Sequence, residues 1–385
     1  MCDVGDSASL RFSGAIVYLV IGRCRTWLGL FTGGKMMERP KTVILHVGPH
    51  KTGTTHLQAA FVRNRTRLET GGVGYSDRHI YLFGHHHLPE ALRSENFDLN
   101  GPVAAEFRDA FLTHDTNVIS SEEFAKLSMP ELETLRDLFA DCTVKVVYFL
   151  RHPMHMFPSL WQEMIKHGAD LTFHDFMETA AGRAAHYELD VYSNTSQLLR
   201  MASVFGRTNL SLPIFENVMA SGEDLFDYFV RNYLPASVGA VELEKLETST
   251  NASLPPRFTE LIRCMNLVCR EEFPELAPPL VTSAFNKHQS EIVTDPKFQV
   301  FFEKFKTHWQ AFTLGMNDEI FVKEEVLICN LYADLIPNKM ETGRLRQFDE
   351  EATKTVPYAA RRWIYSEDQA EYIRALIRTY VLSGG

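Results

Sequence analysis

Segment 45–58 constrains the fold more than any other part of the sequence. It reads LHVGPHKTGTTHLQ, an apolar run followed by glycines and then by a helix-like pattern. Residues 43–47 are mostly apolar and β-branched, which is typical of a strand buried in a parallel sheet. After Thr54, apolar side chains recur at helical spacing without a proline. A strand, a glycine-rich turn and a helix in this order predict a phosphate-binding loop.

The residues of this loop are suited to an anion. At a strand-to-helix turn, free backbone N–H groups and the positive end of the helix dipole favour a bound phosphate or sulfate. Gly48 and Gly53 allow close approach of the backbone. Thr54 and Thr55 add hydroxyl donors, and Lys51 adds a positive charge. In the usual triphosphate loop, G-x-x-x-x-G-K-[ST], the lysine follows the second glycine. Here the lysine comes first, which predicts a different anionic ligand.

A second pattern follows the apolar, strand-like run 144–150. Arg151 comes directly after this run, and Ser159 lies eight residues further on. An arginine at the carboxyl end of a central strand can bind two phosphate oxygens, and a serine on the next helix can donate a further hydrogen bond. Pro153 suits the first turn of that helix, whereas Pro158 is expected to make the helix begin later or kink.

Together, the two patterns resemble the sulfotransferases that use 3′-phosphoadenosine 5′-phosphosulfate (PAPS), and the bacterial and carbohydrate types most closely. In that family a lysine, one further residue and Gly-Thr-Thr bind the 5′-phosphosulfate, while a strand-end arginine and a later serine bind the 3′-phosphate. The resemblance implies PAPS as the co-substrate and adenosine 3′,5′-bisphosphate as the product. The residues that it assigns to PAPS are His50, Lys51, Thr52, Gly53, Thr54, Thr55, Arg151 and Ser159.

Sulfuryl transfer needs positive charge at the leaving oxygen and a base for the acceptor hydroxyl. Lys51 is the candidate for the charge. The apolar strand-like run 117–121 leads into Glu122 and Glu123, which resembles the strand-end glutamate of carbohydrate-type sulfotransferases. We favour Glu122 as the base because it comes first beyond the strand.

Three consecutive histidines, His85, His86 and His87, are the alternative source of a base. Imidazole titrates near neutral pH and can accept a proton from a sugar hydroxyl. Neighbouring side chains in a helix or strand point in different directions, so at most one or two of them can face a single site. No further His, Cys or Asp at zinc-ligand spacing accompanies them, and we therefore expect no metal site.

The pattern of the rest of the chain predicts the architecture. Helical and strand-like segments alternate up to about residue 250, with a helix at 193–204, a strand at 209–216 and a helix at 222–233. Such alternation predicts a three-layer α/β/α fold with a central parallel sheet, like that of P-loop nucleoside-triphosphate hydrolases. Residues 251–385 are expected to be mainly helical, with helices at 256–270, 298–312 and 366–381. We expect 41–385 to form one sulfotransferase domain, with its α/β core at 41–250.

Residues 1–40 differ from the rest. Their apolar run, 14–22, is interrupted by Arg23 and Arg25 and is shorter than the ~20 residues of a spanning helix. The segment also lacks the features of a signal peptide. We expect a poorly ordered extension without a stable membrane span. A start at Met36 or Met37, and a membrane-anchored lumenal enzyme, are the alternatives.

Composition limits the partners and the compartment. The 385 residues carry a net charge of −10, which disfavours nucleic acid as a partner. The six cysteines include no C-x-x-C pair, which is typical of a reducing, cytoplasmic setting. A disulfide between Cys264 and Cys269, or between other cysteines, is the open alternative.

The sequence therefore predicts sulfuryl transfer from PAPS to a hydroxyl of a carbohydrate or another small molecule. A P-loop kinase that uses ATP and magnesium is the first alternative, but Thr54 rather than lysine follows Gly53, and no strand-end aspartate is evident. A non-catalytic binding protein of the same fold is the second alternative. The presence of Lys51, Arg151 and Glu122 disfavours it.

Overall fold

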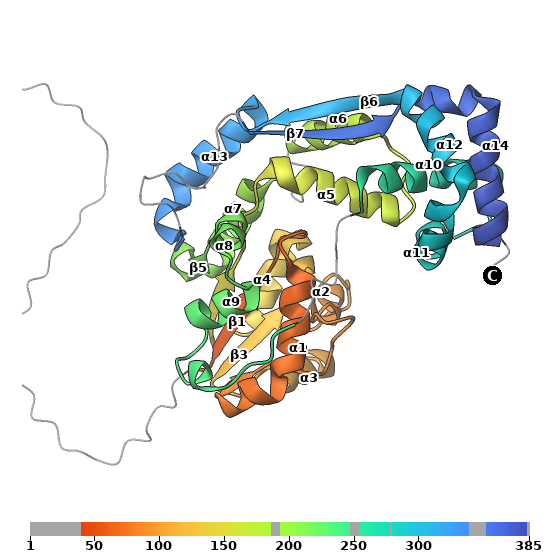
Figure 1. The fold of residues 1–385 in the computed structure, drawn as a ribbon. Helices are drawn as coiled ribbons and strands as arrows, with labels where there is room; N and C mark the ends of the chain where they lie inside the picture. Colours follow the sequence, from red (N-terminus) through yellow and green to blue (C-terminus); the bar gives the residue numbers. More distant parts are fainter. Residues whose placement is uncertain (1–39, 186–192, 247–253, 278, 339–351, 383–385) are drawn as a thin grey trace, which may run out of the picture. The chain divides into compact units, whose positions relative to one another are not determined.

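The computed structural model describes residues 40–185, 193–246, 254–277, 279–338 and 352–382 (Figure 1). Within it, Pro40–Gly385 forms one compact unit. The expected N-terminal extension lies, except for Pro40, outside the described residues. Among the helices in the described ranges, none is long and apolar enough to cross a membrane.

A five-stranded sheet lies at the centre of the α/β part, and all its strand pairs are parallel. The strand order is β2-β3-β1-β4-β5. In the central three strands, His46 is aligned with Ser120 on one side and with Val147 on the other. The carboxyl ends of these strands therefore lie side by side. The strands are β1 (Thr42–His46), β2 (Val73–Gly74), β3 (Thr116–Ser120), β4 (Thr143–Val147) and β5 (Leu210–Ser211).

Helices follow most of the strands and continue through the C-terminal part of the chain. A 3-10 helix, η1 (Glu122–Lys126), directly follows β3, and a π-helix, η8 (Ile377–Leu382), follows the last α-helix. The α-helices are α1 (Thr54–Thr70), α2 (His87–Leu92), α3 (Pro102–Phe111), α4 (Met129–Leu138), α5 (Pro153–Lys166), α6 (Phe173–Ala185), α7 (Asn194–Phe205), α8 (Phe215–Ser221), α9 (Leu225–Tyr233), α10 (Pro256–Glu272), α11 (Pro279–Thr294), α12 (Pro296–Phe305), α13 (Glu319–Tyr332) and α14 (Glu367–Leu376).

Two layers of helices cover the sheet because both faces of its central strands are apolar. Val43 and Leu45 of β1 belong to a buried cluster with side chains of α2, α3, α4 and α7. Ile44, between them, belongs to a second cluster with side chains of α1, α8 and α9. Alternate residues of a strand face opposite sides of a sheet, so these clusters lie on its two faces. The prediction of a three-layer α/β/α fold is confirmed.

The C-terminal part contains a strand pair that the sequence pattern did not predict. β6 (Trp309–Gly315) and β7 (Thr353–Ala359) form a two-stranded antiparallel sheet, which Figure 1 shows beside α6. The predicted helix 298–312 is therefore wrong beyond α12, which ends at Phe305. Its phenylalanines continued the helical pattern, whereas the pairing that makes β6 a strand comes from residues 38 to 50 positions away.

Helix α5 also differs from its prediction. It begins at Pro153 and includes Pro158, so the expectation of a later start is wrong. Pro153 is the first helical residue, where the missing N–H costs nothing. Met156, Phe157 and Trp161 of α5 are buried, and their packing offsets the backbone hydrogen bond that Pro158 cannot make.

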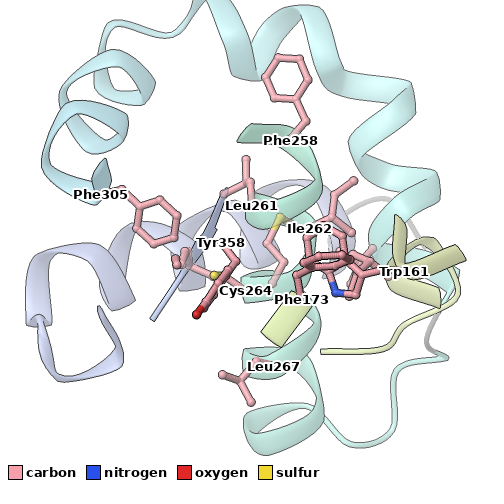
Figure 2. Close-up of a cluster of buried hydrophobic side chains, with 14 of the residues drawn as sticks. Trp161, Phe173, Phe258, Leu261, Ile262, Cys264, Leu267, Phe305 and Tyr358 are labelled. Carbon is pink, nitrogen blue, oxygen red and sulfur yellow. The ribbon is translucent and has the colours of Figure 1, made fainter. Parts of the chain in front are cut away.

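A large buried cluster holds the C-terminal elements together. Figure 2 shows Trp161 of α5, Phe258 and Cys264 of α10, Phe305 of α12 and Tyr358 of β7 in this cluster. Cys264 and Cys269 both lie on α10 as free thiols. The alternative of a disulfide between them is wrong.

One buried ion pair lies next to this cluster. Arg263 and Glu260 are both fully buried, and two guanidinium–carboxylate contacts of 3.0 Å join them. Arg263 also donates to the carbonyls of Asp170 and Ala359, and Glu260 accepts the N–H of Ala359. The pair therefore links α10, the segment between α5 and α6, and β7.

Replacing Arg263 with leucine is expected to destabilise the protein by about 3–5 kcal/mol, because it leaves the Glu260 charge buried without its partner. The midpoint of urea unfolding followed by circular dichroism measures the change. As a control, Glu303→Gln breaks an exposed pair with Lys306 (2.6 Å) and is expected to cost less than about 1 kcal/mol. Equal effects of the two substitutions would contradict a structural role for the buried pair.

Candidate active site

Three loops meet at the carboxyl edge of the sheet because they leave the adjacent strands β3, β1 and β4. The Phe149 N–H donates to the Gly48 carbonyl (2.9 Å), and the Ser121 N–H donates to the His46 carbonyl (3.0 Å). These bonds continue the parallel pairing past the ends of the strands. Ligands of open α/β sheets bind beyond this edge.

The loop between β1 and α1 needs glycine for two physical reasons. Gly48 and Gly53 have φ angles of 87° and 72°, in the left-handed region that favours glycine. A Cβ atom on Gly48 would also lie 2.9 Å from the Cβ of Glu122. Gly48 therefore allows the loop after β1 to touch the loop after β3, which carries Glu122. Lys51 adopts a left-handed φ of 71° as well, a conformation that costs a non-glycine residue on the order of 1 kcal/mol.

A cavity of about 440 Å³ opens beside this loop, at the N-terminus of α1. Its wall combines loop residues with side chains from α5, α11 and the segment before α10. Both cationic and anionic groups face it, together with two leucines. The lining residues are His50, Lys51, Thr54, Thr55, Glu122, Leu160, Glu163, Lys166, Leu254 and Asn286.

The loop residues that were expected to bind PAPS have two kinds of surroundings in the structure. Lys51, Thr54 and Thr55 line the cavity, where the backbone N–H groups of the first turn of α1 lie. Thr52 is fully buried instead, and its hydroxyl donates to the Pro49 carbonyl (2.7 Å). Thr52 therefore shapes the loop through this bond, and its hydroxyl is already used.

Arg151 contacts the backbone of the same loop but is not among the residues that line the cavity. One of its terminal nitrogens donates to the Lys51 carbonyl, and its guanidinium lies 5.4 Å from the ring centre of Phe215. Its Nε is buried and has no hydrogen-bond partner among the described residues. Burial lowers the pKa of Arg151, partly offset by Glu216. An anion at this guanidinium would satisfy the free donor.

Ser159 lies on α5, two turns after Arg151. Its hydroxyl donates to the His155 carbonyl one turn earlier in the helix (3.0 Å). Ser159 is partly exposed and can rotate away from this bond. The structure thus places it on the helix that follows Arg151, with its hydroxyl turned to the backbone.

The two strand-end glutamates have different surroundings. Glu122 lines the cavity, and its carboxylate accepts a hydrogen bond from Gln58 of α1 (2.8 Å). Glu123 instead contacts His50 (3.3 Å), Lys126 (2.6 Å) and Arg93 (3.2 Å). The contact with His50, together with Lys126, holds the pKa of Glu123 well below its usual range. Glu123 itself does not line the cavity, and its carboxylate is engaged by these three side chains.

The three histidines have different surroundings in the structure. His85 is fully buried, with its Nδ1 accepting the Ser120 N–H (3.1 Å) and its Nε2 bonded to the Ser76 carbonyl (3.0 Å). Burial lowers its pKa to about 4, so the ring is neutral near pH 7. His86 contacts the Ser121 hydroxyl (2.7 Å), beside Glu122, and His87 is exposed at the start of α2. Of the three, His86 is the one with a hydrogen bond to the residue beside Glu122 among the described contacts.

Sequence reasoning missed several residues of this cavity. Gln58 holds Glu122, and its position in the first turns of α1 was the available signal. Glu163 follows Ser159 by four residues, so helical spacing places both on one face of α5. Leu254 and Asn286 come from distant segments, and no local pattern connects them to the loop.

No protein-family model matches the sequence, and no curated protein is significantly similar to it. Among solved structures, a sulfotransferase from Alicyclobacillus acidocaldarius is 17% identical over 60% of this chain and 95% of that chain, with a TM-score of 0.37. The sulfotransferase domain from the Synechococcus PCC 7002 olefin synthase is 14% identical over 57% of this chain and 80% of that chain, with a TM-score of 0.32. Similarities this low do not assign the chain to a family.

Proposed function

We propose that this protein transfers a sulfuryl group from PAPS to a hydroxyl of a carbohydrate or a related polar molecule. The observation that carries the proposal is the cavity itself, in which Lys51, Thr54 and Thr55 at the start of α1 face the same space as Glu122. A cation and helix N–H groups suit an anionic donor, while a carboxylate suits an acceptor hydroxyl.

The residues of the loop fit the two anionic ends of PAPS. His50, Lys51, Thr52, Gly53, Thr54 and Thr55 would hold the 5′-phosphosulfate, with Thr52 contributing through the shape of the loop. Arg151 and Ser159 would hold the 3′-phosphate. The unpartnered, buried Nε of Arg151 is the free donor that such an anion would satisfy. When bound, PAPS supplies the sulfuryl group and adenosine 3′,5′-bisphosphate as the leaving group.

The chemistry of the chain's own groups follows from their positions. Glu122 accepts the proton of the acceptor hydroxyl, whose oxygen then forms the new bond to sulfur. Lys51 and the N–H groups of α1 stabilise the negative charge that develops on the phosphate oxygen as its bond to sulfur breaks. The polar lining from Glu163, Lys166 and Asn286 favours a hydroxyl-rich acceptor over an apolar one.

Thermal stabilisation by bound nucleotides tests whether the donor is PAPS or ATP. Adenosine 3′,5′-bisphosphate at about 100 times its Kd is expected to raise the melting temperature by a few degrees, because binding to the native state adds about 2.7 kcal/mol. Adenosine 5′-monophosphate, which lacks the 3′-phosphate, is the matched control and is expected to act weakly, as is ATP with magnesium. Equal or larger shifts with ATP and magnesium would favour a kinase and overturn the proposal.

A further inference from the structure

The ammonium of Lys51 is already paired inside the cavity. Its Nζ lies 2.7 Å from Oε2 of Glu163, a residue of α5 that is 112 positions away in the sequence. Both side chains are partly exposed and line the same space. The group proposed to serve the donor's leaving oxygen therefore faces an internal carboxylate in this structure.

Glu163 has two further neighbours, a lysine and a histidine. Lys166 Nζ lies 3.5 Å from its Oε2, and His167 Nε2 lies 3.3 Å from its Oε1. Burial raises the pKa of Glu163, but the hydrogen bond and charge of Lys51, with Lys166 and His167, outweigh this and lower it to about 2. The carboxylate is therefore charged throughout the physiological pH range. It also keeps the Lys166 ammonium and the His167 ring as neighbours if Lys51 leaves.

The pair conflicts with a bound donor. An anionic sulfuryl donor at the N-terminus of α1 would lie against Lys51 and thereby close to the Glu163 carboxylate, and like charges at short range repel. The conflict is relieved if Lys51 turns from Glu163 to the donor. Ser159, one helical turn before Glu163, lies on the same face of α5 and would bind the other end of the donor.

We propose that Glu163 is a positioning residue that holds Lys51 away from the donor in the empty protein and releases it when the donor binds. Lys166 then balances the charge of Glu163, and His167 stays in contact with its other carboxylate oxygen. This inference rests on the proposed function. It makes the strength of donor binding depend on the competition between Glu163 and the donor for one ammonium group.

Calorimetric titration with adenosine 3′,5′-bisphosphate tests the inference in the wild type, Glu163→Gln, Lys51→Met and the double variant. Glu163→Gln is expected to bind about two- to fivefold more tightly, which is the range for losing a partly exposed ion pair. In the Lys51→Met background the same substitution is expected to change binding by less than about 1.5-fold, because the competition has been removed. In turnover, Glu163→Gln is expected to lower the donor KM more than it changes kcat.

The outcomes are distinguishable. Unchanged or weaker binding by folded Glu163→Gln, or an equal gain in the Lys51→Met background, would overturn the role of Glu163 while leaving the proposed function intact. A wild type that does not bind the bisphosphate would overturn both. Glu163→Asp, which keeps the charge but shortens the reach, is a second variant and should also bind more tightly than the wild type. Glu303→Gln, which breaks the remote pair with Lys306, should bind like the wild type.

Discussion

Replacing Lys51 with alanine is expected to lower kcat for sulfuryl transfer by at least about 100-fold, which is the typical cost of removing one group that stabilises the charge developing in a transition state. The Lys51 ammonium lines the cavity at the N-terminus of α1. Transfer of labelled sulfate from PAPS to a panel of carbohydrate acceptors measures the loss. By contrast, Arg151→Ala should mainly raise the donor KM, because Arg151 lies behind the loop rather than in the cavity lining.

Two further measurements make this expectation decisive. Lys306→Met, which removes a lysine from an exposed pair in the C-terminal part, should retain the kcat of the wild type. Circular dichroism should show that Lys51→Ala is folded, since the Lys51 side chain belongs to none of the three hydrophobic clusters formed by the described residues. A folded Lys51→Ala protein with near-normal turnover would show that the lysine does not act on the leaving group.

Local patterns were sufficient where the physical cause was local. The apolar run before Gly48 and the helical spacing after Thr54 predicted β1 and α1, because burial and glycine geometry act within a few residues. The same reasoning placed the loop, Arg151 and Glu122 each directly after a strand. Parallel strands that alternate with helices place their carboxyl ends together.

Long-range contacts were beyond the reach of such patterns. The lysine of the loop looked like a free cation, whereas in the structure it is paired with Glu163 of another element. The run of three histidines was expected to place at most one or two members in a site, but the sequence did not show which ones. In the structure the first member is a buried hydrogen-bonding residue and the last is exposed. β6 became a strand because β7 pairs with it. Each difference depends on a partner that sequence neighbours do not identify.

Replacing Glu122 with glutamine is expected to reduce kcat by about 100- to 10,000-fold, the range for losing a positioned general base. The amide is similar in size and can keep the contact with Gln58 but cannot accept the acceptor's proton. Glu123→Gln should reduce kcat by less than about threefold, because its carboxylate is engaged by His50, Lys126 and Arg93. Initial rates at saturating donor and acceptor measure both effects.

A measurement of donor binding shows whether a variant has lost only the general base or the whole donor-binding site. Glu122→Gln should still be stabilised by adenosine 3′,5′-bisphosphate to the same extent as the wild type, because Glu122 lies on the acceptor side of the proposed reaction. If both glutamine variants remained active, the base would have to lie elsewhere, and His86 would be the first residue to replace. It is the histidine that contacts Ser121, next to Glu122. His85→Gln would then serve as its control, because the neutral His85 ring is used in holding Ser120 and Ser76 together.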